Sequence, residues 1–296
     1  MNNLNIFSSP LKLLDVGASY FIPDTWKIPS LVLNTTIILV DPNGNNLTYA
    51  KDLKCQTFCI ASAVAEQSGW RTLYLANTDS GSSLYPPLAR VKLDKVDNDP
   101  YFYPLRLKNI QVSTLQHELN RIDLHQIDAI KLDTQGSELE IIKGLDHDRL
   151  KDVQLIEIEV SLENPPFYQG ATKLREVLAY LEPLGFSLIN IRLSRSKKII
   201  KYDLPIPNEC DALLFRSRST FDQDSNDKNL LIRRLALLNL YYIYSAADTE
   251  LIFMEKSDLF SSEELMLIRN SQLQLRQFQD EILSNGGLSL WHRDSA

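Results

Sequence analysis

Short apolar runs alternate with stretches of helical apolar spacing over the chain up to about residue 218. Five of these runs predict strands, at residues 11–16, 36–40, 56–60, 127–133 and 153–160. Apolar residues at helical spacing predict a helix over 171–184. Two closing strands are expected at 186–193 and 210–216, joined by an irregular stretch that contains Pro205 and Pro207. Such alternation predicts an α/β fold with a mainly parallel sheet and helices on both faces.

A polar segment, residues 217–229, separates this region from the rest of the chain. It is rich in Ser, Asp and Asn, which is typical of a domain boundary. Beyond it, apolar residues recur at near-helical spacing, and a further helix begins near Ser261. We therefore predict a domain over 1–218, followed by a linker and helical extension over 219–296. The apolar side chains of the extension must pack on the sheet domain, on one another or on a second subunit, and we expect a homodimer built partly by them.

The fourth apolar run ends at Asp133 and turns at once into a helix. Gly136 permits a tight turn, Ser137 and Glu140 have the spacing of a capping box, and Gly144 is suited to end the helix. Ligands in open α/β sheets bind beyond the carboxyl ends of the strands, so Asp133 lies where chemistry usually takes place. The alternative is an ordinary strand-to-helix junction in which this carboxylate only caps the helix.

Two further strands also end on carboxylates. Asp15 and Gly17 follow the first run without a G-x-G-x-x-G pattern, so a dinucleotide site is only weakly indicated. Asp41 and Pro42 follow the second run, at a spacing that lets the carboxylate accept hydrogen bonds from ribose hydroxyls. Three carboxylates are therefore expected at one edge of the sheet.

The charge, the cysteines and the apolar stretches of the chain exclude several classes of protein. The net charge of −7 leaves no basic footprint of the kind that nucleic-acid binding requires. The three cysteines form no pairing framework, which fits a reducing cytoplasm, and Cys55 and Cys59 are expected to be small buried strand residues. The longest apolar stretch, residues 31–40, is too short to cross a bilayer, and no export signal is expected at the N-terminus. These features predict a cytoplasmic protein that does not bind nucleic acid.

Eight matching stretches in order along the chain carry a family resemblance. They are LDVGA at 14–18, VDP at 40–42, SSL at 82–84, IKLDTQGSEL at 130–139, EVS at 159–161, Tyr168, GF at 185–186 and DALLF at 211–215. On these motifs the chain resembles the FkbM-family methyltransferases. The resemblance implies a Rossmann-like class I methyltransferase fold, S-adenosylmethionine as cofactor, and methyl transfer to a hydroxyl of a sugar, glycan or natural product.

The resemblance also implies roles for individual residues. The expected cofactor contacts are Asp15, Gly17, Ala18, Asp41, Pro42, Ala61, Ser62, Ala63 and Asp133. The expected substrate contacts are Trp26, Ser82, Ser83, Gln135, Glu138 and Tyr168. Asp133 and Glu159 are expected on neighbouring strands at the substrate end of the site.

Methyl transfer to a hydroxyl requires alignment of the reactants and removal of one proton. Asp133 is the first choice for the catalytic base and Glu159 the second. The same two carboxylates are also suited to hold a divalent cation through hard oxygen ligands, and the sequence does not separate these alternatives.

One segment departs from the family pattern. Residues 20–23 read Tyr-Phe-Ile-Pro where the family commonly has further glycine in the first loop. Either this loop takes another path and its aromatic residues line the pocket, or cofactor binding is weakened. The second case leaves an alternative function, a catalytically silent binding or scaffold protein that keeps the methyltransferase fold.

Overall fold

A seven-stranded sheet forms the centre of the computed structural model, which describes residues 10–87, 105–162, 167–193, 198–201, 204–218 and 227–284. In spatial order its strands are β3 (Gln56–Ile60), β2 (Thr35–Val40), β1 (Leu11–Val16), β7 (Ala129–Leu132), β8 (Leu155–Ser161), β12 (Glu209–Arg216) and β9 (Phe186–Leu193). The first five are parallel, and β12 runs antiparallel to both of its neighbours. The predicted mainly parallel sheet is confirmed, and β1, β3 and β9 have the predicted bounds.

The strand order reverses direction between β1 and β7. From β1 the chain adds β2 and β3 on one side, then returns to place β7 and β8 on the other. A crevice at the carboxyl ends of the strands is expected at such a switch point. Residues that follow β1, β2 and β7 therefore meet at one edge of the sheet, although they lie far apart in the sequence.

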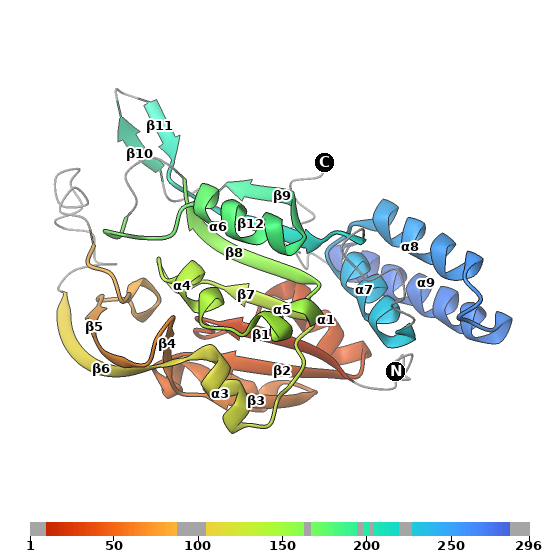
Figure 1. The fold of residues 1–296 in the computed structure, drawn as a ribbon, viewed down its shortest axis with the longest axis horizontal. Helices are drawn as coiled ribbons and strands as arrows, with labels where there is room; N and C mark the ends of the chain where they lie inside the picture. The colour runs from red at the N-terminus through yellow and green to blue at the C-terminus, as the bar shows by residue number, and fades with distance from the viewer. Residues whose placement is uncertain are drawn as a thin grey trace.

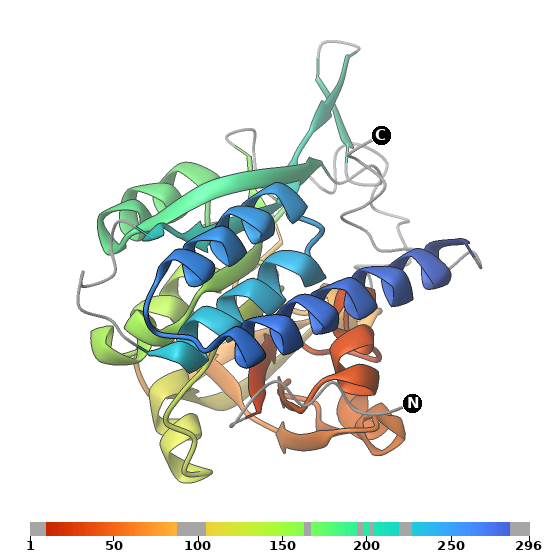
Figure 2. The same cartoon turned by 90° about the vertical axis from the view of Figure 1, so that its right-hand side faces the viewer.

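Helices cover both faces of the sheet. One face carries α3 (Leu115–Arg121), α4 (Glu138–Lys143), α5 (His147–Asp152) and α6 (Leu174–Leu181), which is followed by the 3-10 turn η4 (Glu182–Leu184). The other face carries α1 (Asp24–Val32), α7 (Lys228–Leu240), α8 (Tyr244–Lys256) and α9 (Ser262–Ser284). Figure 2 shows these last three helices, in cyan and blue, in front of the sheet. No described helix combines the length and apolar character needed to cross a membrane.

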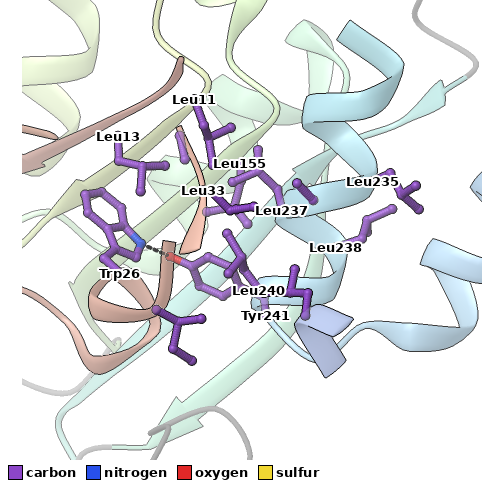
Figure 3. Packing of buried hydrophobic residues seen from close by; sticks show 14 of the residues in the cluster. Leu11, Leu13, Trp26, Leu33, Leu155, Leu235, Leu237, Leu238, Leu240 and Tyr241 are labelled. Atoms are coloured by element: carbon purple, nitrogen blue, oxygen red, sulfur yellow. Dashed lines mark hydrogen bonds between the residues drawn. The ribbon is translucent and has the colours of Figure 1, made fainter. Parts of the chain in front are cut away.

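The helical extension shares its core with the sheet. Ten residues of α7, from Leu231 to Leu240, are buried. Figure 3 shows Leu235, Leu237 and Tyr241 gathered with Leu11 of β1 in one apolar cluster. A helix that is buried on all sides must be surrounded by other elements. The extension therefore packs on the sheet within one chain. Residues 219–226 of the predicted linker lie outside the described part.

Two buried ion pairs fix α7 in place. Arg233 pairs with Asp128 just before β7, and Arg234 pairs with Glu250 of α8. Burial raises the pKa of Asp128 to about 6, and the charge of Arg233 opposes that rise. Removing one partner of a buried pair leaves an uncompensated charge, so the geometry of these pairs specifies where the helix lies.

Several elements differ from the sequence prediction. A second sheet contains β4 (Ala63–Ala65), β6 (Arg106–Thr114) and β5 (Gly69–Leu75), in that order, beside the main sheet (Figure 1). The stretch predicted to be irregular instead forms a hairpin, β10 (Lys198–Lys201) with β11 (Leu204–Pro207). The prolines are tolerated because each strand has only one neighbour, so an absent N–H breaks no second ladder. Cys59 is exposed rather than buried, because β3 is an edge strand.

The predicted capping box at the start of α4 is wrong. The Ser137 side chain makes no hydrogen bond that caps the helix, and it donates to Thr134 Oγ1 instead. Glu138 supplies the bonds that close this turn, because its Oε1 accepts from the backbone N–H groups of Thr134 and Gly136, each at 2.9 Å. Gly144 ends the helix, as predicted.

Candidate active site

A cleft of about 950 Å³ opens at the carboxyl ends of β1, β2, β7 and β8. Apolar residues of the second sheet, Leu73, Leu75 and Ile110, form part of its wall. Eleven residues predicted for the site line this cleft: Asp15, Gly17, Asp41, Pro42, Ser62, Ala63, Ser82, Ser83, Asp133, Gln135 and Glu159. The switch point in the strand order has therefore brought the three predicted strand-end carboxylates into one cavity.

Gly17 brings the loops after β1 and β7 into direct contact. Its φ is +86°, and a Cβ added there would lie 2.0 Å from the carbonyl oxygen of Asp133. The Asp133 N–H in turn donates to Val16 O at 3.0 Å. Only glycine fits this position, because any side chain would overlap the backbone opposite. The loop expected to hold the cofactor thus lies against the residue expected to be catalytic.

Asp41 is held ready to accept hydrogen bonds from a ligand by donors of its own loop. It accepts from Ser19 Oγ and Asn43 N, each at 2.8 Å, and from Asn46 Nδ2 at 3.3 Å. Burial raises the pKa of Asp41, and these hydrogen bonds oppose the rise. A carboxylate offers about four lone-pair sites, so acceptor capacity is left for a ribose hydroxyl.

The unusual loop 20–23 takes a path along the cleft. Tyr20 has a φ of +69°, and its hydroxyl donates to Asp79 Oδ2 at 3.2 Å. Tyr20 and Phe21 line the cavity, whereas Ile22 is buried in the core. Of the two outcomes considered from the sequence, the structure shows the one in which the aromatic residues line the pocket.

A single amide group joins the two predicted catalytic carboxylates. Gln135 Nε2 donates to Asp133 Oδ1 and to Glu159 Oε2, each at 2.8 Å. Behind this amide, the Tyr168 hydroxyl lies 3.2 Å from Gln135 Oε1 and makes a shorter hydrogen bond, of 2.7 Å, to the carbonyl oxygen of Gly81. Ser83 Oγ donates to the Gln135 carbonyl at 2.7 Å and holds the backbone. Asp133 and Glu159 are therefore presented to the cleft at a defined separation.

A row of charged residues forms the floor of the cleft. Asp15, Lys131 and Glu157 lie opposite one another in the register of β1, β7 and β8. Lys131 Nζ lies 3.5 Å from Asp15 Oδ1 and 3.5 Å from Asp133 Oδ2. Burial raises the pKa of Asp15 to about 6, and the charge of Lys131 opposes that rise. Burial lowers the pKa of Lys131, but the surrounding carboxylates, led by Asp15, outweigh it and leave that pKa raised.

Sequence reasoning did not assign Lys131 or Glu157 to the site. Each lies two residues before a predicted catalytic carboxylate, Asp133 or Glu159. Because successive side chains of a strand alternate between faces, the period of two places each pair on the same face. That period was the signal available from the sequence. A further missed pair, Arg192 and Asp211, forms an ion pair at the closing strands and also lines the cleft.

Five predicted contacts lie elsewhere than in the cleft lining: Ala18, Ala61, Trp26, Glu138 and Tyr168. Trp26 is fully buried and donates through Nε1 to the hydroxyl of Tyr241 at 2.7 Å. Glu138 is 1% exposed and bonds the loop that precedes its own helix. Tyr168 is buried, and its hydroxyl lies between the carbonyl oxygen of Gly81, at 2.7 Å, and Gln135 Oε1, at 3.2 Å. In these three residues the structure shows packing and positioning roles.

The pH dependence of stability in Glu138→Gln tests whether Glu138 is a buried structural residue. Burial raises the pKa of Glu138 from 4.5 to about 7, and the backbone N–H groups that it binds oppose the rise. The folded state therefore holds a proton that the unfolded state loses, so the stability contributed by Glu138 falls as the pH rises from about 4.5 to 7. Glutamine does not titrate, so we expect Glu138→Gln to gain roughly 2 kcal/mol relative to wild type between pH 5 and pH 8. Denaturant unfolding at both pH values measures this, and a pH-independent difference would contradict it.

The two carboxylates do not suit a shared divalent cation in this arrangement. Asp133 and Glu159 each direct one oxygen at the Gln135 NH₂ group, and an N–H repels a cation. Within the described ranges no group of three or more His, Cys, Asp or Glu side chains is placed to hold a metal ion.

The cleft has the features of a class I methyltransferase site. An acidic residue lies near the end of the first strand and a close-packed glycine follows that strand. A second acidic residue follows the next strand, and a parallel sheet closes with one antiparallel strand. The fold and the site thus define a S-adenosylmethionine-dependent methyltransferase. A family model, the methyltransferase FkbM domain, matches residues 15–188, more than half of the 296 residues. The chain belongs to the FkbM methyltransferase family.

Solved structures similar to the chain are distant in sequence. One is a Streptococcus pneumoniae protein assigned as a tRNA (m1A22) methyltransferase, solved with S-adenosyl-L-methionine. The two sequences are 10% identical, the match covers 90% of this chain and 94% of that chain, and the TM-score is 0.31. Another is a TehB-like SAM-dependent methyltransferase from Corynebacterium glutamicum, with 12% identity, coverage of 71% and 82%, and a TM-score of 0.31. No curated protein matches the chain significantly.

Proposed function

We propose that this protein transfers a methyl group from S-adenosylmethionine to a hydroxyl oxygen of a sugar, glycan or natural product. The observation that carries the proposal is the pair Asp133 and Glu159, joined by the Gln135 amide directly beside the Gly17 loop. Carboxylates accept hydrogen bonds from hydroxyl groups, and two of them at a defined separation suit an acceptor with neighbouring hydroxyls.

The cofactor supplies an electrophilic methyl group on a positively charged sulfur. Asp41 would accept hydrogen bonds from the ribose hydroxyls, and Gly17 lets the ligand approach the backbone closely. Ser62 and Ala63 line the cleft after β3, where small side chains leave room for the adenine ring. With these contacts, the sulfur end of the cofactor would lie toward Asp133.

Asp133 is the proposed base. Its side chain is 36% exposed, so an acceptor hydroxyl has access to its oxygens. Deprotonation by Asp133 makes the hydroxyl nucleophilic as the methyl group is transferred, while Gln135 and Lys131 hold the carboxylate in position. Glu159, on the other side of the same amide, is placed to accept a hydrogen bond from a second hydroxyl of the acceptor. Positioning of the reactants accounts for a large part of the acceleration.

Two measurements test this function. Calorimetric titration with S-adenosylhomocysteine is expected to show binding, whereas no binding at millimolar ligand would favour the alternative of a silent scaffold. A panel of sugar nucleotides, glycans and hydroxylated natural products is then incubated with methyl-labelled cofactor. Transfer of label to an oxygen supports the proposal, and transfer only to nitrogen or carbon acceptors would refute it.

Asp41→Ala is expected to weaken cofactor binding. Loss of a charge-assisted hydrogen bond costs about 1.5 to 3 kcal/mol, which is a rise in Kd of about 10- to 150-fold. The variant also frees three donors of the loop, so its melting temperature is recorded with its Kd. Asp52→Ala changes an exposed carboxylate outside the cleft lining and should leave the Kd unaltered. If Asp41→Ala binds the cofactor with unchanged affinity, Asp41 does not bind the ribose.

The assembly and location remain proposals. We propose a cytoplasmic homodimer that is assembled partly through the helical extension. Exposed apolar residues of α9, namely Met266, Leu267 and Leu273, support a contact there, because each is more than half exposed. A chain that is monomeric in light scattering at micromolar concentration would refute the dimer.

A further inference from the structure

Tyr241 connects the helical extension to the floor of the cleft. It follows α7 directly and is 3% exposed. Its hydroxyl accepts from Trp26 Nε1 at 2.7 Å, the bond drawn in Figure 3, and donates to Glu157 Oε2 at 2.7 Å. The direction of these bonds is determined, because an indole N–H only donates and the hydroxyl has one proton.

Glu157 extends this connection into the site. The residue is 4% exposed, lines the cleft and lies opposite Lys131 in the register of β7 and β8. Lys131 in turn lies 3.5 Å from both Asp15 and Asp133. The Tyr241 hydroxyl is therefore two side chains away from the proposed catalytic base, although the two residues lie on opposite sides of the polar linker.

We propose that Tyr241 is a positioning residue of the methyl-transfer site: it holds the Glu157 carboxyl group toward Lys131, and so maintains an acidic floor that favours a cationic cofactor. This inference rests on the proposed function. The carboxylates that act on Lys131 are Asp15, Asp133, Glu157 and Asp211. Arg192 pairs with Asp211, so these four carboxylates outnumber the two cations beside them.

The Tyr241 hydroxyl is the donor in its hydrogen bond with Glu157. Burial raises the pKa of Tyr241 well above its usual value, and the charge of Glu157 raises it further. The hydroxyl thus keeps its proton throughout the neutral range. Donation from a neutral hydroxyl stabilises the charged form of a buried carboxyl, and loss of that donor favours its protonation.

Two ligands that differ by one charge reveal this effect. S-adenosylmethionine carries a positive sulfur, whereas the sulfur of S-adenosylhomocysteine is neutral, and the rest of the two molecules is alike apart from the methyl group. An acidic floor attracts only the positive sulfur. The ratio of the two dissociation constants therefore reports the charge of the floor, whereas a general loosening of the site weakens both ligands together.

The experiment measures both dissociation constants by calorimetry between pH 6.5 and 8 in the full chain. Tyr241→Phe keeps the ring and removes the donor, and it should lower the preference for S-adenosylmethionine about threefold or more, because part of a charged hydrogen bond is lost. Tyr244→Phe is the matched control, since Tyr244 donates only within the extension, to Gln279 Oε1 at 3.3 Å. The control should leave the ratio unchanged.

Glu157→Gln is the second variant and keeps the test decisive if Tyr241→Phe does not fold. Glutamine keeps an oxygen that accepts from Tyr241 but carries no charge, so the ratio should shift in the same direction. If the wild type binds both ligands and either folded variant retains the wild-type ratio at every pH, the inference is overturned. If the wild type binds neither ligand, the proposed function itself has failed, and the two failures are thus distinguished.

Discussion

Gly17→Ala is expected to destabilise the protein by about 4 kcal/mol and to abolish measurable cofactor binding, from backbone strain and the clash together. The added Cβ would lie 2.0 Å from the Asp133 carbonyl oxygen, and the φ of +86° is itself strained for any L side chain. The loops after β1 and β7 must therefore separate, which moves the backbone at both the cofactor loop and the proposed base. Denaturant unfolding and calorimetric titration measure the two effects.

The chain offers a matched control for this substitution. Gly69, at the start of β5, has no heavy atom within 4 Å of an added Cβ. Gly69→Ala should change the free energy of unfolding by no more than about 0.5 kcal/mol and leave cofactor affinity intact. Equal effects of the two substitutions would show that the contact between Gly17 and Asp133 has no special importance.

Asp133→Asn is expected to lower turnover by about a hundredfold or more, because the reaction loses its base. The fold should persist. Asparagine still offers an oxygen to Gln135 Nε2, so the amide that joins the two sides of the site keeps one of its partners. The variant loses the ion pair with Lys131, which predicts a modest change in melting temperature. Initial rates with the acceptor identified in the panel, at saturating cofactor, measure the effect.

Asp123→Asn serves as the comparison for this prediction, since Asp123 is an exposed carboxylate paired only with His125 on the surface. It should retain full turnover. If Asp133→Asn keeps its activity while its melting temperature falls, Asp133 is a structural residue of the strand-to-helix junction. Glu159 would then be the catalytic base, and Glu159→Gln would be the variant that loses turnover.

The helical extension contributes a contact to the floor of the cleft. The family model covers residues 15–188, yet Tyr241 contacts Glu157 in the floor of the cleft. Leu235 and Leu237 share one apolar cluster with Leu11 of β1. A truncation near Arg218 would therefore expose one face of the sheet and remove a donor from the site at the same time.

The sequence by itself determined the central sheet and the carboxylates at its edge. β1 is covered on both faces and appears as a nearly continuous apolar run, so it was predicted with its observed bounds. The edge strands β3 and β9 were also predicted with their observed bounds. The position of Asp15, Asp41 and Asp133 followed from one rule, because the carboxyl ends of parallel strands meet at one edge. These are local signals, in which each residue's role depends on its immediate neighbours in the chain.

Only the tertiary structure decided which side chains meet within that edge. Lys131 lies between Asp15 and Glu157 because β7 inserts between β1 and β8, and strand order is a property of the whole chain. Trp26 lies in the core rather than in the predicted substrate site, because it bonds to Tyr241 there. The two residues are 215 positions apart in the sequence. Such contacts depend on loop closure and packing between distant segments, and no periodicity within a short window encodes them.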